Sequence, residues 1–373
     1  TAGAQMCSEG DDEDRSRICF TILMPNQPPV ADAGSDLVVH EADHVTLQGS
    51  FTDPNAGDTH TVRWHMVSST NGQSVEDVTT AELSFTPVDD GVYVFQFTVT
   101  DNLGAQGSDI VAVTAVNVPP VAHIGEVTDE TGARIGIDVP VALAGLTIGL
   151  AGTFDDVGMT DSHVAAIDWG AGSPDQHAAF DVFSDCFGTS TGAVAARHVY
   201  VEPGTFTITL RVTDNSAGVG TATFQIEVVD ASGAIATVVE SLAPLANDRA
   251  VQTAIGKLQG GRGGDAANGA LDKLEQGNLN AALEKIVQAL QCLEAVGNPD
   301  LTHEKSLLAL SAKSVTVGAI ARAEAVATWP DALMKVALAK ALVQQGDALI
   351  AEHEYSAAAG MYQVAARQVQ GIR

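Results

Sequence analysis

The chain has 373 residues, of which 45% are hydrophobic, and a formal net charge of −29 at pH 7. That length suits two to four domains with real cores, and no apolar run reaches the roughly 18 residues that would predict a membrane span. The charge argues against nucleic acid as a partner, because phosphate binding needs clustered lysine and arginine. No signal peptide is apparent after Thr1, so we interpret the sequence as a mature protein or a fragment.

The charge is unevenly distributed. Residues 1–231 carry six arginines, no lysine and 33 acidic residues, whereas residues 232–373 carry 12 basic and 14 acidic residues. A lysine-free acidic half suits cations, salty surroundings or basic partners. Solubility alone is the alternative explanation.

Residues 1–25 form a leader. Its acidic run, Gly10 to Asp14, predicts a solvated loop. The following segment, Ile18 to Met24, is strand-like and largely apolar. We expect that strand either to pair with the chain's own first β domain or to add to the sheet edge of a neighbouring molecule, which would be a device for polymerisation.

Two copies of one β module follow, over residues 26–117 and 118–231. Each copy opens on a Pro-Pro-Val-Ala phrase and continues with Leu-x-Gly-x-Phe-x-Asp, a single Trp and Val-Thr-Asp-Asn. These features lie at Pro28–Ala31, Leu47–Asp53, Trp64 and Val99–Asn102 in the first copy, and at Pro119–Ala122, Leu150–Asp156, Trp169 and Val212–Asn215 in the second. Short β-rich segments with regularly spaced Gly, Pro and Asp turns predict two antiparallel sandwiches, with each Trp in a core.

The second copy carries a family resemblance. Its run from His198 to Asn215, with Asp168-Trp169-Gly170 before it, resembles the polycystic kidney disease (PKD) domain. That family has a Trp-Asp-Phe-Gly-Asp-Gly turn, reduced here, and a His-x-Tyr-x-x-Pro-Gly run, kept here. The first copy is also similar to cadherin-like bacterial repeats through Phe51 to Pro54 and Gly57-Asp58. The resemblance implies immunoglobulin-like sandwiches on a secreted or cell-surface protein, and it implies no activity.

After Ser232 the pattern changes to Ala, Leu, Gln and Glu at helical spacing. Residues 232–373 therefore predict an all-α helical bundle or a helical-hairpin domain. Thr328 to Asp331 predicts a helix start with Pro in the first turn.

A fainter repeat lies inside this α-helical region. Gly277 to Leu283 aligns with His353 to Ala359 at an offset of 76 residues. A helix, a short turn and an Ala-rich helix are similar to tetratricopeptide-like hairpins, and an ordinary Ala-rich bundle is the alternative. We expect this nearly neutral domain to offer a docking surface lined by helices.

Two enzyme-like motifs fail the test of context. His40 to His44 matches His-Glu-x-x-His, but a zinc protease needs that motif on a helix and its flanks here are strand-like. We expect a polar hairpin turn instead. Gly188 to Gly192 matches Gly-x-Ser-x-Gly without the strand–turn–helix setting of a nucleophile elbow. We therefore predict no catalytic residue, no organic cofactor and no enzyme activity.

Carboxylates at turns are the stronger candidates for a site. In the first sandwich we expect the turns of Asp53, Asp58 and Asp101 near the interdomain end. The matching set in the second sandwich is Asp155, Asp156, Asp161 and Asp214. Ca²⁺ takes six to eight oxygen ligands, which such loops supply, and the resemblance favours it because some PKD and cadherin-like relatives bind Ca²⁺ near such turns. The alternative is that each Asp caps its own turn.

Four cysteines occur, and none forms a Cys-x-x-Cys pair. Cys7 and Cys19 flank a short polar loop and are candidates for a disulfide there. Cys186 and Cys292 lie in different predicted domains, so they would either link those domains or stay free thiols. An even count fits an oxidising, extracellular setting.

These features predict a non-enzymatic extracellular protein of structural or adhesive type, secreted or at a cell surface. Its sandwiches would form a stalk within a surface or filamentous assembly, and its helical domain would contact other proteins or copies of itself. The alternative is an accessory binding region of a secreted hydrolase or protease whose catalytic domain lies outside this chain. Neither version includes nucleic acid or membrane insertion.

Overall fold

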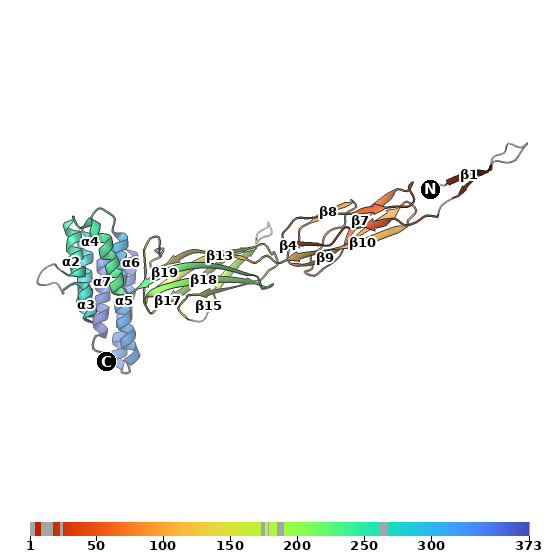
Figure 1. Cartoon of the computed structure of the whole chain (residues 1–373). Coiled ribbons are helices and arrows are strands. Elements are labelled where there is room, and N and C mark those ends of the chain that lie inside the picture. Colours follow the sequence, from red (N-terminus) through yellow and green to blue (C-terminus); the bar gives the residue numbers. More distant parts are fainter. Residues whose placement is uncertain are drawn as a thin grey trace, which may run out of the picture.

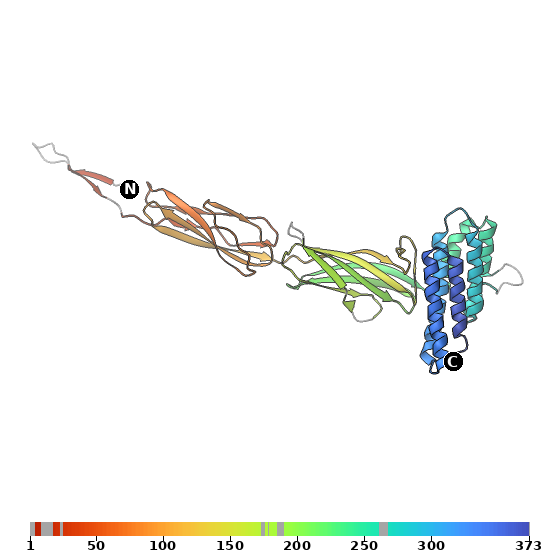
Figure 2. The same cartoon turned by 180° about the vertical axis from the view of Figure 1, so that it is seen from behind.

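A computed structural model describes residues 4–8, 18–22, 25–172, 176–177, 179–184, 190–260 and 268–372. A hairpin, two β sandwiches and a helical domain follow one another along a rod, and the helices run across its long axis (Figures 1 and 2). The predicted fold class is confirmed: two tandem immunoglobulin-like sandwiches precede an all-α domain.

The leader forms a hairpin of its own. Strand β1 (Ala4–Ser8) pairs antiparallel with β2 (Ile18–Ile22) as a separate two-stranded sheet. The expectation that this segment joins the first sandwich is therefore wrong for the described residues. Cys7 and Cys19 are Cα partners in the hairpin register, which brings the two backbones close enough for a disulfide, and the disulfide stays a prediction. The acidic run lies outside the described residues.

Alternation of apolar and polar residues builds the first sandwich. Along β9 every second residue from Tyr93 to Asp101 is buried, as the two-residue period of a strand requires. Trp64 has no exposed surface, which confirms its place in the core. The main sheet has the order β4-β10-β9-β7, and β3-β6 and β5-β8 form smaller pairs. The strands are β3 (Val30–Asp32), β4 (Leu37–His40), β5 (Val45–Gln48), β6 (Ser50–Thr52), β7 (His60–Ser69), β8 (Glu82–Phe85), β9 (Gly91–Asp101) and β10 (Gln106–Val116).

The second sandwich repeats this plan in two continuous sheets. One sheet has the order β11-β13-β17-β16 and the other β12-β19-β18-β14-β15. Trp169 is 2% exposed and also lies in the core. The strands are β11 (Val121–Thr128), β12 (Ala142–Leu143), β13 (Thr147–Asp156), β14 (His163–Asp168), β15 (Gln176–His177), β16 (Ala179–Ser184), β17 (Ser190–Val199), β18 (Gly204–Asp214) and β19 (Val219–Val229).

The duplicated Pro-Pro phrase has a structural partner in each copy. A Cβ atom on Gly107 would lie 1.9 Å from the carbonyl oxygen of Pro29, and one on Gly220 would lie 2.0 Å from that of Pro120. Glycine therefore lets the phrase lie against the last strand of its own sandwich.

The helical domain starts where the last strand ends. Asp230 caps α1 by accepting a hydrogen bond from the Gly233 N–H, so the domain begins at Ala231, one residue before the predicted boundary. No helix in the described part of the chain is long and apolar enough to span a bilayer. The helices are α1 (Ala231–Leu242), α2 (Arg249–Gln259), α3 (Ala270–Glu275), α4 (Leu279–Glu294), α5 (Thr302–Val326), α6 (Pro330–Ala351) and α7 (Tyr355–Val369), with a 3₁₀ turn at Ala243–Leu245.

The fainter repeat is a repeat of structure as well. Gly277 and His353, 76 residues apart, both adopt positive φ, at 70° and 62°, just before a helix. Helices α4 and α7 then start at Leu279 and Tyr355, again 76 residues apart. Their buried positions follow one register, so the two turn–helix units pack alike.

The described residues form three hydrophobic cores. Each sandwich has its own. The core of the helical domain also includes Val141, Leu143 and Leu146, which belong to the second sandwich. The second sandwich and the helices are thus joined by shared apolar packing, whereas the two sandwiches meet through polar residues.

Candidate functional site

A polar layer closes the same end of each sandwich. In the second copy the inward-facing row of β13 runs through Phe154 to Asp156, and that of β18 runs through Val212 to Asp214. Strand β14 begins at this end with the buried His163. Strand alternation therefore points acids and a histidine into the end of the core, where apolar residues would otherwise lie.

Hydrogen bonds fix part of this layer. Nε2 of His163 lies 2.7 Å from Oδ2 of Asp156, and both side chains have no exposed surface. The side-chain amide of Asn117 donates to Oδ2 of Asp214 at 2.9 Å, and the Gly218 N–H donates to Oδ1 at 2.8 Å.

The first sandwich adds three more acids from two of its turns. Glu41 lies between β4 and β5 and accepts a hydrogen bond from the Val118 N–H at 2.7 Å. Asp89 and Asp90 lie just before β9. Asp89 accepts from the hydroxyl of Thr160 and Asp90 from that of Ser216. The junction of the sandwiches is therefore built from carboxylates.

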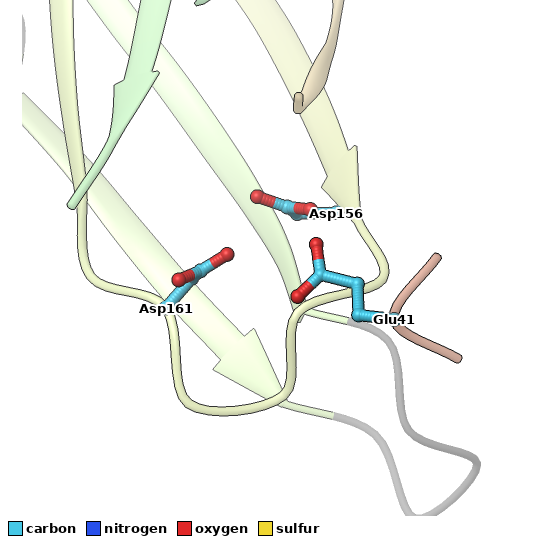
Figure 3. A group of neighbouring side chains, drawn as sticks. All are labelled: Glu41, Asp156 and Asp161. Carbon is cyan, nitrogen blue, oxygen red and sulfur yellow. The ribbon is translucent and has the colours of Figure 1, made fainter. Parts of the chain in front are cut away.

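Three of these carboxylates converge. One oxygen each from Glu41, Asp156 and Asp161 lies within 4.8 Å of the other two, and Figure 3 shows the three side chains facing one another. Their residues are 2%, 3% and 8% exposed. Glu41 also groups with Asp89 and Asp90 by the same distance, so it is shared by two clusters.

Several of the converging oxygens have no hydrogen-bond partner among the described residues. These are Oε2 of Glu41 and both carboxylate oxygens of Asp161. Burial, followed by the neighbouring acids, raises the pKa of Glu41 to about 7, against a hydrogen bond from Val118 that lowers it. Burial, followed by Asp89, Asp156 and Asp214, raises the pKa of Asp161 to about 6. The junction is thus short of positive charge for the acids it contains.

The matching acids of the first sandwich lie elsewhere. Asp53, Asp58 and Asp101 also bring one oxygen each within 4.8 Å of one another. They lie beside Asn26, at the end of β9 opposite Asp90, so the expectation that they lie near the interdomain end is wrong. A hydrogen bond from His60 lowers the pKa of Asp53, and one from Asn26 lowers the pKa of Asp101.

The predicted acids divide into two roles. Asp101 accepts from the N–H groups of Leu103 and Ala105, as Asp214 does from Gly218, so both cap their own turns. Asp155 is exposed on the outward face of β13, with Oδ2 3.7 Å from Nε2 of His123, so it lies outside the cluster. Alternation along the strand turns Asp156 inward and Asp155 outward.

The zinc-protease-like segment is a polar turn, but the expectation of a hairpin is wrong, because β4 pairs with β10 and β5 pairs with β8. His40 and His44 are exposed, and Glu41 between them is buried at the junction. Sequence reasoning missed Glu41, Asp89 and Asp90 as site residues. These acids lie in turns that a second domain buries, and such burial leaves no local sequence pattern. Only the order of the domains along the chain could have indicated that these turns face a junction.

The remaining sequence candidates add no site. Cys292 is a free, partly buried thiol, and Cys186 lies outside the described residues. Of the Gly-x-Ser-x-Gly segment, Ser190 to Gly192 belong to strand β17 and the first two residues are outside the described range. No helix follows the serine, so the nucleophile-elbow interpretation has no support in the described residues.

A cleft of about 1040 Å³ lies between the second sandwich and the helices and is lined by residues of both domains. Lys313 on α5 pairs there with Glu130 and Asp347. Burial lowers the pKa of Lys313, but its hydrogen bonds to Asp347 and Glu130 raise it by more. The ammonium of Lys313 is therefore paired within the cleft.

Comparison with known proteins supports the first sandwich as a PKD-like domain. Residues 33–115 match the family model that describes the PKD domain of KIAA0319-like proteins. The chain is 35% identical over 101 residues to low-density lipoprotein receptor-related protein 11 of Mus musculus, covering 25% of this chain and 20% of that protein. It is also 35% identical over 104 residues to the dyslexia-associated protein KIAA0319-like protein of Mus musculus, covering 26% of this chain and 10% of that one.

The chain thus spans a fifth or less of the length of these two relatives. Among solved structures, bovine butyrophilin aligns with 54% of this chain and 99% of its own, at 12% identity and a TM-score of 0.29.

Proposed function

We propose that this chain is a non-enzymatic, extracellular structural protein of adhesion type, in which two sandwiches form an acidic stalk that carries a helical contact domain. The observation that supports this most directly is the end-to-end order of the units, with the helices at one end of the rod and the N-terminal hairpin at the other (Figure 1). A PKD-like domain match over residues 33–115 supports the extracellular setting.

The two halves suit different tasks. The sandwiches carry almost all of the net negative charge, so stalks of neighbouring copies repel each other. The helical domain is nearly neutral and packs onto the second sandwich through shared apolar residues. Electrostatic repulsion therefore opposes contact between copies least at the helical end.

Helix α6 offers a surface for that contact. Leu333, Met334 and Leu338 are 50%, 65% and 48% exposed and lie on one side of the helix. Exposed apolar groups gathered on one helix face favour association with another surface. We propose that this α6 face meets a second copy of the helical domain.

Sedimentation velocity over a range of concentrations tests the proposal, together with electron microscopy of the full chain. We expect elongated particles that associate in pairs through their globular ends, and the variant Met334→Glu should weaken pairing at least about tenfold, because it places a charge in an apolar contact. The control Lys335→Glu alters charge on the same helix and should weaken pairing less. Monomers at every concentration would overturn the contact, and compact or folded-over particles would overturn the stalk.

A further inference from the structure

We propose that the carboxylates of Glu41, Asp156 and Asp161 hold a divalent cation, Ca²⁺ by its chemistry, in a site that neither sandwich can form alone. The first sandwich supplies Glu41 and the second supplies both aspartates. The site does not depend on the proposed contact between copies.

The buried oxygens without partners carry the inference. A carboxylate oxygen removed from water without a hydrogen bond costs free energy, and a charged one costs much more unless a cation compensates it. Glu41 is 2% exposed and Asp161 is 8% exposed, yet Oε2 of Glu41 and both carboxylate oxygens of Asp161 have no hydrogen-bond partner in the part of the chain that the structure describes. All three side chains are directed at one point (Figure 3).

The spacing fits Ca²⁺. Protein oxygens lie about 2.3–2.6 Å from bound Ca²⁺, so two ligands of one ion stand at most about 5 Å apart. The three oxygens here lie within 4.8 Å of one another. Every donor is a hard carboxylate oxygen from a turn or a strand end, which is the ligand type that Ca²⁺ prefers.

The backbone leaves room for these carboxylates. A Cβ atom on Gly158 would lie 2.1 Å from Oδ2 of Asp161 and 3.2 Å from Oε2 of Glu41. A side chain at that position would displace both ligands. The loop between β13 and β14 therefore passes close to the acids because residue 158 is glycine.

The existing contacts leave the cluster negative. His163 is hydrogen-bonded to Asp156, but no described residue donates a hydrogen bond to Oε2 of Glu41 or to either carboxylate oxygen of Asp161, so the ionised carboxylates repel one another. A divalent cation removes that repulsion and ties Glu41 to the second sandwich. Binding would therefore stiffen the joint between the sandwiches.

Calorimetry of the full chain at neutral pH tests the site, with CaCl₂ as the probe and EDTA as the reference. We expect calcium to raise the melting temperature, because a ligand that binds only the folded state stabilises it. Titration calorimetry should give a Kd on the order of 10⁻⁴–10⁻³ M, the range of extracellular modules. The variant Asp161→Asn should weaken binding at least about tenfold.

Two further measurements separate binding from a structural role. In EDTA, Asp161→Asn should melt above the wild-type chain, since it removes a buried repelling charge, whereas loss of a structural contact would lower its melting temperature. The matched control Asp155→Asn removes the same charge beside Asp156 but outside the cluster, and should bind calcium as the wild type does. Equal melting temperatures of the wild-type chain in calcium and EDTA, or equal calcium binding by Asp161→Asn and Asp155→Asn, would overturn the site. Extended particles without calcium binding would overturn the site alone and leave the stalk intact.

Discussion

The two sandwiches close one end with the same residues, and the copies differ in what lies above that end. Asp53 and His60 of the first copy correspond to Asp156 and His163 of the second, and in both the ring nitrogen lies 2.7 Å from the carboxylate. The first pair is 5% and 13% exposed, whereas the second has no exposed surface. The difference arises because the first sandwich covers the end of the second.

Burial beneath the first sandwich changes the electrostatics of acids that the two copies share. Hydrogen bonds lower the pKa of Asp53 and Asp101 in the first copy. In the second copy burial raises the pKa of Asp161 to about 6. Asp101 and Asp214 cap their turns in both copies, so what the second copy adds is the joint in which Asp156 and Asp161 meet Glu41 of the other sandwich.

The two junctions at the ends of the second sandwich differ at one equivalent position. Glu41 of the first copy and Ala144 of the second occupy one position: their N–H groups donate to Val116 and Val229, the ends of the last strands. Glu41 faces another sandwich across an acidic joint. Ala144 faces the helices, and its carbonyl accepts from the hydroxyl of Ser314 at 2.7 Å. A single position therefore distinguishes a polar joint from an apolar one.

The largest difference between the copies should appear at the histidines. Replacing His163 by Leu leaves Asp156 buried without its partner, and breaking such a buried pair costs about 3–5 kcal/mol of unfolding free energy. The matched variant His60→Leu should lose clearly less, because water reaches that pair. Urea unfolding in EDTA at neutral pH gives both values, and equal losses would contradict the role assigned to cover.

The glycines test what the copies share. Gly107→Ala and Gly220→Ala each place a Cβ atom about 2 Å from a proline carbonyl oxygen, so each should lose up to about 3 kcal/mol through overpacking. The two variants should lose similar unfolding free energy, since the glycine–proline contact lies within each sandwich and does not involve the other sandwich. The control is Gly256→Ala, which lies on helix α2 with open space around it and should leave the free energy of unfolding unchanged or raise it. Gly72→Ala would not serve as a control, because φ at Gly72 is positive and alanine would be strained there. A loss in only one sandwich would show that the phrase has different roles in the two copies.

The sequence predicted the local features well. The repeated phrases predicted both sandwiches and the buried positions of Trp64 and Trp169, because strand alternation and turn residues act within a few neighbours. The 76-residue offset in the helical domain predicted matching turns at Gly277 and His353, although Gly and His share no obvious propensity beyond tolerance of that turn.

The site was only half predictable. Asp156 and Asp161 follow from the repeat, whereas Glu41 and Asp89 join them only because the first sandwich is stacked on the second. Asp155 was included because one residue of register decides whether a side chain faces the core, and a double Asp hides that choice. Leader strand β2 was misplaced because its partner, β1, lies in a segment without strong strand character.

The smallest effect concerns His198, which occupies the place of Phe85 in the first copy. Val45 pairs with Phe85 and Ile148 pairs with His198 in matching registers. The His198 ring stacks on Trp169 with centroids 4.9 Å apart, and burial lowers its pKa. Its contribution to stability is complete above the ordinary histidine value near 6.5 and is lost as pH falls below it, because the unfolded chain then binds the proton more tightly.

The variant His198→Phe should therefore lose less stability than the wild type between neutral pH and pH near 5, and should gain on the order of 1 kcal/mol at the acidic end from the buried ring. Urea unfolding across that pH range in EDTA measures both profiles. Phe85→His, the reverse exchange, should give the first sandwich the acid sensitivity that the second one has. Parallel profiles for the wild type and His198→Phe would mean that the pKa of His198 is the same in the folded and unfolded chains. The substitution would then change stability through packing alone.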